Sequence, residues 1–260
     1  MTVKSLEKAL RILLSFEPHR RSQTLLEIAK HTSMPVTSLY RFLETFEKFG
    51  FIKSDPGGKS YNLGPALFRL GMLSYDSVDL REAAKAEMEK LAEVTGESIF
   101  LTVRDGSNSV CIESAEGRHR VRLTQRIGAV LPLHAGAAAK VLLAYMPESE
   151  RENVLKSLQL RSLGPGTITK RSALEKDIRA IRSRGYPVSR EEVDVGSCGV
   201  AVPVFSENGE VVAAVASGGP IYRFTDKKIK QLVNELTKAS QTIGKNLGSA
   251  TERFVGGVKR

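Results

Sequence analysis

A helix that begins near Pro35 carries residue types that can meet a nucleic acid on one of its faces. The side chains on that face are small or polar, with one aromatic ring and one guanidinium, and belong to Val36, Thr37, Ser38, Tyr40 and Arg41. Hydroxyl groups and arginine donate hydrogen bonds to phosphate oxygens and base edges in protein–DNA complexes. The other face is apolar at i, i+3, i+4 and i+7, at Leu39, Phe42, Leu43 and Phe46. This spacing predicts a helix that packs through its apolar face and contacts DNA with the polar one.

The segments on either side of this helix complete a winged helix-turn-helix. Before it, Thr24 can cap a helix and Glu27 can complete a capping box three residues later. We expect Pro35 at the first helical position, where the backbone N–H would have no partner. After it, β-rich runs at residues 51–53 and 60–63 flank a turn with Pro and paired Gly, which predicts the wing. Helix-turn-helix shapes also occur as plain packing units, but the polar face, the turn length and the wing agree on DNA binding.

We expect double-stranded operator DNA to be the partner of this region. The predicted contacts are Thr24, Pro35, Val36, Thr37, Ser38, Tyr40, Arg41, Lys53 and Lys59. Residues 1–63 hold ten Lys and Arg against six Asp and Glu, in a chain whose net charge is +10. This excess of positive charge suits a polyanion.

Other residues permit two alternative chemistries. Cys198 resembles a nucleophile with His134 as its base, but the sequence supplies no third group to orient them. A zinc site could combine Cys111, His119, His134 and Cys198, although no close pair of ligands supports it. We therefore expect no enzyme, no metal and no cofactor. The alternative function is a small-molecule enzyme or carrier with a helix-turn-helix-like appendage.

Length and composition limit the class of protein. The chain has 260 residues, long enough for two domains, and 41% of them are hydrophobic. No apolar run is long enough to span a membrane, and we expect no signal peptide. The two Cys residues are too few for a disulfide framework. These features favour a cytoplasmic protein without a membrane partner.

The remaining elements predict an α+β protein. We expect helices at residues 5–16, 64–75, 80–94, 136–145, 147–158 and 225–247, and another that Gly185 ends. We expect strands at residues 98–103, 110–114, 118–125, 199–205 and 210–217, with residues 218–220 ending the last one. Short turns between strands predict an antiparallel sheet. The predicted domains are a winged helix-turn-helix at 1–63, a linker helix at 64–78 and an effector domain at 79–260.

The chain resembles the IclR family of bacterial transcription regulators from about residue 5 to residue 243. The motifs that carry the resemblance lie at residues 126–140 (RIGAVLPLHAGAAAK), 185–192 (GYPVSREE), 199–205 (GVAVPVF) and 213–220 (AAVASGGP). The resemblance implies a homodimer, often a pair of dimers, on an operator. It also implies a GAF/PAS-like effector domain that binds a small metabolite, often an organic or aromatic acid. Repressors and activators both occur in such a family.

The resemblance also implies a ligand site, in which this chain departs from the usual residues. The implied ligand-binding residues are Leu123, Ala137, Ala138, Ser189, Cys198, Gly199, Ala216, Ser217 and Gly218. The family often has Asp at the position of Ser189, Cys at that of Gly199, and Ser at those of Ala216 and Gly218. Cys198 and Ser217 are each shifted by one position, so their side chains would point the other way. We therefore expect a less polar, roomier pocket that takes a bulkier or aromatic ligand.

Overall fold

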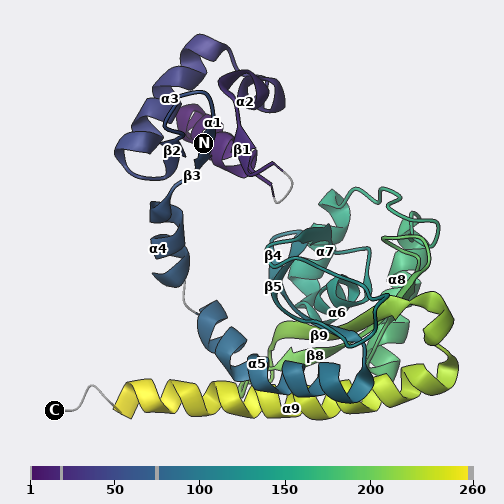
Figure 1. Cartoon of the computed structure of the whole chain (residues 1–260). Helices are drawn as coiled ribbons and strands as arrows, with labels where there is room; N and C mark the ends of the chain where they lie inside the picture. Colours follow the sequence, from purple (N-terminus) through teal and green to yellow (C-terminus); the bar gives the residue numbers. More distant parts are fainter. Residues whose placement is uncertain (1, 18–19, 74–75, 257–260) are drawn as a thin grey trace. The chain divides into compact units, whose positions relative to one another are not determined.

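The computed structural model describes residues 2–17, 20–73 and 76–256 of the chain (Figure 1). The chain divides into two compact units, Met1–Asp76 and Ser77–Arg260. The domain borders at residues 63 and 78 stay predictions. Each unit is described here by itself.

The N-terminal unit is a winged helix-turn-helix followed by a helix. Its elements are α1 (Lys4–Leu14), β1 (Ser22–Gln23), α2 (Leu25–Thr32), α3 (Val36–Lys48), β2 (Ile52–Ser54), β3 (Tyr61–Leu63) and α4 (Pro65–Leu73). The three strands form an antiparallel sheet in the order β1-β3-β2. The predicted wing is confirmed, and β1 is an addition because two residues are too few for a sequence pattern.

Local capping sets the start of both helices of the motif. The capping box at α2 is present as predicted: Thr24 Oγ1 accepts the Glu27 N–H, and the Glu27 carboxylate accepts the Thr24 N–H at 2.7 Å. The placement of Pro35 at the first helical position was wrong, because its ψ of 137° is extended and α3 begins at Val36. Pro35 is instead the N-cap residue of α3, and its carbonyl accepts the Leu39 N–H at 3.0 Å.

The core of this unit follows the apolar stripe of α3. Leu39 and Leu43 are buried, and they pack with Ile12 of α1, Ile28 of α2 and Ile52 of β2. Burying one such side chain stabilises a fold by about 1.5–3 kcal/mol. The stripe therefore fixes which face of α3 remains at the surface.

The C-terminal unit is an α+β domain around one six-stranded antiparallel sheet. Its helices are α5 (Asp76–Thr95), α6 (Ala137–Tyr145), α7 (Glu148–Ser157), α8 (Arg171–Arg184) and α9 (Asp226–Gly256), with a 3₁₀ turn at Ile221–Arg223. Its strands are β4 (Ser98–Asp105), β5 (Asn108–Ala115), β6 (Val130–Pro132), β7 (Val188–Arg190), β8 (Ser197–Phe205) and β9 (Val211–Pro220). The order is β6-β5-β4-β9-β8-β7, which agrees with the predicted antiparallel sheet.

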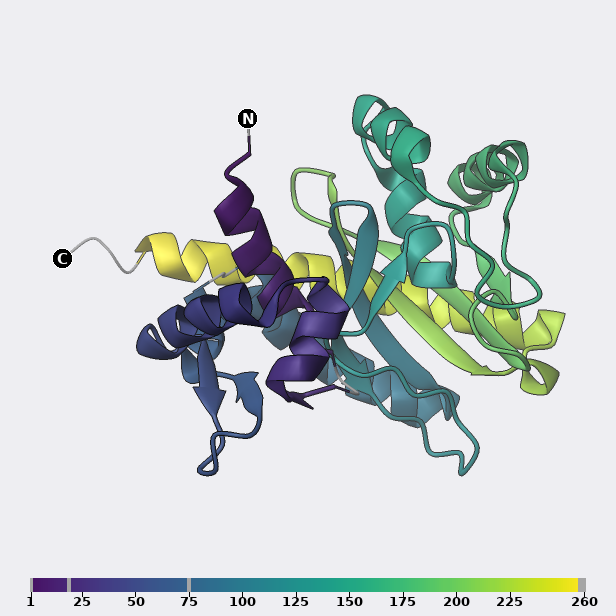
Figure 2. The ribbon, with the colours of Figure 1, turned by 90° about the horizontal axis from the view of Figure 1, so that it is seen from above.

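Helices cover both faces of this sheet (Figures 1 and 2). Helices α5 and α9 pack on one face, where Val200 and Val202 of β8 point. Helices α6, α7 and α8 pack on the other face, where Ala201 of β8 and Ala214 of β9 point. Small residues on this second face let α6 approach the strands closely.

Two strand predictions were wrong. Residues 118–125 form a loop and not a half-buried strand; Val121 is 63% exposed there, and Arg118 and Arg122 pair with Glu93 and Glu116. The sequence pattern alternates, but these ion pairs occupy the Arg side chains, and no strand of the described ranges pairs with this segment. Strand β9 also continues through residues 218–220, since Gly218 pairs with both Ser98 and Gly199.

No helix in the described part of the chain has the length and apolar character needed to cross a membrane.

Candidate functional site

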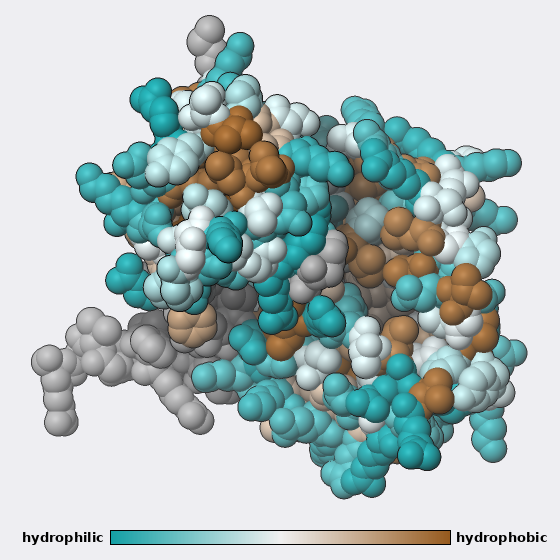
Figure 3. Space-filling view, turned by 45° about the horizontal axis from the view of Figure 1, so that its top comes forward, coloured by the Kyte–Doolittle hydropathy of each residue, from teal (hydrophilic) through white to brown (hydrophobic). Residues whose placement is uncertain are grey.

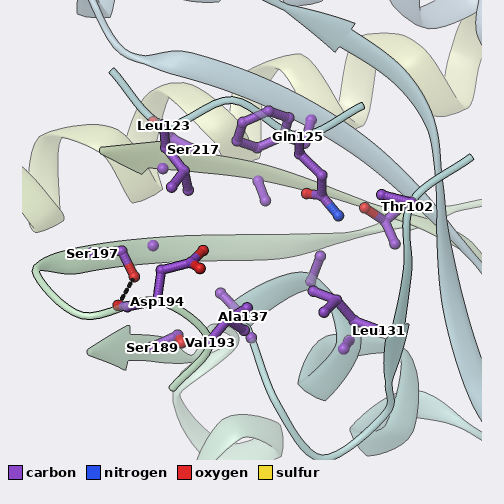
Figure 4. A pocket seen from close by; sticks show the side chains of 18 of the residues that line it. Thr102, Leu123, Gln125, Leu131, Ala137, Ser189, Val193, Asp194, Ser197 and Ser217 are labelled. Carbon is purple, nitrogen blue, oxygen red and sulfur yellow. Dashed lines mark hydrogen bonds between the residues drawn. The ribbon is translucent and has the colours of Figure 1, made fainter. Parts of the chain in front are cut away.

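A cavity of about 170 Å³ lies in the C-terminal unit between the sheet and the beginning of α6 (Figure 4). Its walls are the sheet face, the first turn of α6, the loop at residues 123–125 and the loop that ends where β8 begins at Ser197. All the implied ligand-binding residues line it: Leu123, Ala137, Ala138, Ser189, Cys198, Gly199, Ala216, Ser217 and Gly218. The fold thus brings them to one place, and their role in binding stays a prediction.

Cys198 and Ser217 line the cavity with their backbone. The Cys198 side chain packs in the layer between the sheet and α9. Ser217 pairs with Ile99 and Val200, which point into that same layer, so its side chain also leaves the cavity. The expectation of a one-residue shift in direction therefore agrees with the strand register.

The beginning of α6 supplies hydrogen-bond donors to the cavity. Gly136, with φ of +89°, turns the chain into the helix, and its N–H is held by Glu192 Oε2 at 2.9 Å. Ala137, Ala138 and Ala139 form the first turn, where the helix offers their N–H groups no carbonyl acceptor. These groups and the helix dipole favour an anion such as a carboxylate.

A buried ion-pair cluster holds this first turn in place. Lys140 of α6 is 1% exposed, and its Nζ lies 2.8 Å from Asp177 Oδ2 of α8 and 2.5 Å from Glu192 Oε1. Glu192 therefore joins Lys140 to the Gly136 N–H. Sequence reasoning missed this cluster, since only the lysine inside an apolar helix hinted at a buried partner.

The cavity is mainly apolar, with a few polar groups. Thr102 is 2% exposed, and its hydroxyl has no hydrogen-bond partner within the described part of the chain.

Gly218 provides no spare room, because a Cβ there would lie 2.6 Å from Leu123 Cδ2. Leu123 thus fills the space that a serine would take. The volume is close to the roughly 150 Å³ of an engineered cavity that holds benzene.

The predicted DNA-contacting residues lie on the surface of the N-terminal unit. The exposed ones on α3 and the wing are Val36, Thr37, Ser38, Tyr40, Arg41, Lys53 and Lys59. Arg41 also borders a shallow groove with Ser38 and Thr45. Thr24 is exposed, but its hydroxyl donates to Glu27 Oε2 at 2.9 Å and is not free to donate to a phosphate. Pro35 is exposed as well and has no N–H to offer. These contacts stay predictions.

The alternative chemistries lack support from geometry. His134 Nε2 donates to the Arg161 carbonyl at 2.9 Å, and burial raises the pKa of the Cys198 thiol, which disfavours the thiolate. Burial likewise raises the pKa of the Cys111 thiol to about 11. Within the described ranges, no three His, Cys, Asp or Glu side chains are placed to hold a metal ion together.

Comparison with known proteins matches both units to one family. Residues 72–245 match the family model described as the bacterial transcriptional regulator IclR C-terminal domain, and residues 5–56 match the IclR helix-turn-helix domain. The chain is 35% identical to the HTH-type transcriptional regulator KipR of Bacillus subtilis, covering 91% of this chain and 94% of KipR. It is 31% identical to XynR of Escherichia coli, covering 95% and 98% of the two chains.

A solved structure shows the same fold with a ligand bound. It is an IclR homolog from Microbacterium hydrocarbonoxydans complexed with 4-hydroxybenzoate. The TM-score is 0.81 at 26% identity, and the match covers 94% of this chain and 99% of that one.

Proposed function

The chain belongs to the IclR family of bacterial transcriptional regulators. We propose that it acts as a homodimer and that a small organic acid changes its affinity for the operator. It is an effector-responsive DNA-binding regulator and not an enzyme, since the relatives are transcriptional regulators. The observation that carries the proposal is the cavity at the first turn of α6, where three N–H groups lack helical acceptors in an apolar site.

An aromatic acid fits this cavity best. A carboxylate would accept hydrogen bonds from the N–H groups of residues 137–139, and a ring would contact Phe100, Leu123 and Leu131. The related Microbacterium protein is complexed with 4-hydroxybenzoate, an acid of this kind. We therefore propose an aromatic acid of one ring as the effector.

An exposed apolar stripe supports the homodimer. The stripe follows one side of α1 and includes the N-cap residue before it: Val3, Leu6, Leu10 and Leu14 are 64%, 57%, 49% and 77% exposed. Figure 3 shows apolar side chains gathered on the surface of the N-terminal unit. A second copy could cover such a stripe and place two recognition helices on half-sites about 34 Å apart.

Regulation requires the effector to distinguish two arrangements of the dimer. A ligand that binds both arrangements equally shifts neither population. We propose that an acid on the first turn of α6 favours one arrangement, and that α4 transmits the change to the spacing of the paired α3 helices.

Fluorescence anisotropy on the DNA upstream of the gene tests the regulator function. We expect specific binding against scrambled competitor, with the logarithm of the affinity falling by about 0.9 per neutralised phosphate for each unit in log salt. An acid that binds the cavity should change this affinity. If neither the free protein nor the protein with a panel of aromatic acids prefers the upstream DNA, the proposed operator is wrong.

Small keto acids should be poor ligands. The cavity has Ala216 and Gly218 where a more polar site would carry hydroxyl groups, and it lacks the carboxyl group at position 189. We expect calorimetry to show no micromolar binding of glyoxylate or pyruvate, while an aromatic acid binds more tightly because it buries a ring. Micromolar binding of either keto acid would contradict the aromatic preference.

A further inference from the structure

One carboxylate faces the cavity, and no Lys or Arg is among the described residues that line it. The structure describes every residue that lines the cavity, and among them Asp194 is the only Asp, Glu, Lys or Arg. Asp194 lies in the loop between β7 and β8 and is exposed. Figure 4 shows its carboxylate turned into the cavity beside Ser197.

The loop fixes Asp194 through its backbone and leaves its side chain available. The Asp194 carbonyl accepts the Ser197 hydroxyl at 2.6 Å and the Ser197 N–H at 3.2 Å. Neighbouring Glu191 closes the same loop by accepting the Gly196 N–H at 2.8 Å. The carboxylate is therefore held at the cavity by bonds that a ligand need not break.

The rest of the cavity lining offers hydrogen-bond donors. They are the N–H groups of the first turn of α6 and the Thr102 hydroxyl, which is buried and has no partner within the described residues. The carboxylate of a ligand would rest on these donors. A simple monoacid would then share a partly desolvated cavity with Asp194, and two negative charges in one such site repel each other.

We propose that the effector is a zwitterionic acid, whose protonated amine pairs with Asp194 while its carboxylate rests on the first turn of α6. This inference rests on the proposed function, because it assumes that an acid occupies this cavity. It adds a positive charge to the ligand and makes the ligand net neutral. The cavity volume of about 170 Å³ is enough to hold one ring.

Calorimetry of the full chain with three para-substituted benzoates tests this charge requirement. The ligands are 4-(aminomethyl)benzoate, 4-methylbenzoate and terephthalate, which place a positive, a neutral and a negative group at the same position. We expect the aminomethyl compound to bind about tenfold more tightly than the methyl compound, as for a charge-assisted hydrogen bond, and terephthalate to bind least.

The variant Asp194→Asn should remove this preference and keep the fold, because the residue is exposed and the amide has the same shape. We expect its affinities for the aminomethyl and methyl compounds to agree within about twofold, and terephthalate to gain. The matched control is Glu207→Gln, which removes an exposed carboxylate in the turn between β8 and β9. This control should bind all three compounds like the unchanged chain.

The outcomes distinguish a failure of the zwitterion proposal from a failure of the proposed aromatic-acid site. The proposal of a zwitterionic effector is wrong if the unchanged chain binds 4-methylbenzoate as tightly as the aminomethyl compound, or if Asp194→Asn keeps the preference. Either result would leave the proposed aromatic-acid site unaffected. If none of the three compounds binds at millimolar concentration, the aromatic-acid site fails and the zwitterion fails with it.

Discussion

Replacing Lys140 by methionine is expected to lower the free energy of unfolding of the C-terminal unit by about 3–5 kcal/mol. The Lys140 ammonium lies between Asp177 and Glu192, and the Glu192 side chain is 5% exposed. Methionine has a similar volume but no charge, so the substitution removes the cation beside the buried Glu192, while Asp177 keeps Arg184, whose Nη2 lies 3.8 Å from Asp177 Oδ1. Urea denaturation followed by far-UV circular dichroism measures the loss.

An exposed ion pair supplies the matched control for this substitution. Lys238 of α9 lies 3.0 Å from Glu235 Oε1, and its side chain is 64% exposed. Lys238→Met should cost less than about 1 kcal/mol, because water screens such a pair. If the two lysine variants unfold at the same urea concentration, the buried cluster does not stabilise the unit as we expect.

The cluster also connects stability to effector binding. Glu192 holds both Lys140 and the Gly136 N–H, and Gly136 immediately precedes the N–H groups that face the cavity. A Glu192 released from Lys140 would no longer fix the start of α6. We therefore expect Lys140→Met to weaken acid binding under conditions in which the unit is still folded.

Local sequence signals predicted the N-terminal unit well, because its structure depends on short-range chemistry. Thr24 and Glu27 form their capping box within four residues, and Leu39 and Leu43 belong to one helical stripe. Pro35 was predicted at the first helical position but is the N-cap residue, because a proline suits both positions. The family motifs then located the implied ligand residues around one cavity.

Long-range partners explain what the sequence did not predict. The arginines of the loop at residues 118–125 pair with Glu93 and Glu116, which no local pattern connects to them. Asp194 faces the cavity because the loop between β7 and β8 folds back over α6, and its own neighbours carry no ligand motif. Lys140 likewise needs α8 to supply Asp177. Such residues are found only after the chain is folded.

Removing the Arg41 side chain should weaken binding to a specific operator by roughly 1–3 kcal/mol per half-site, or about 5- to 150-fold. Arg41 is exposed on α3. Leu39 and Leu43 are buried on the opposite face of the helix, so the face that carries Arg41 is at the surface. An arginine on a recognition helix can bond to two acceptors of a guanine in the major groove. Arg41→Ala leaves the core untouched, so the loss should come from DNA contacts and not from unfolding.

The comparison of specific with scrambled DNA decides what Arg41 contacts. A base contact predicts that Arg41→Ala loses more affinity for the operator than for scrambled DNA, whereas a phosphate contact weakens both equally and lowers the salt slope by about 1. Arg69→Ala is the matched control, because Arg69 is an exposed arginine on α4, outside the winged helix, and its loss removes the same charge. Equal losses in the two variants would assign the effect to net charge. An unchanged dissociation constant for Arg41→Ala would instead show that the exposed face of α3 does not read the operator at this residue.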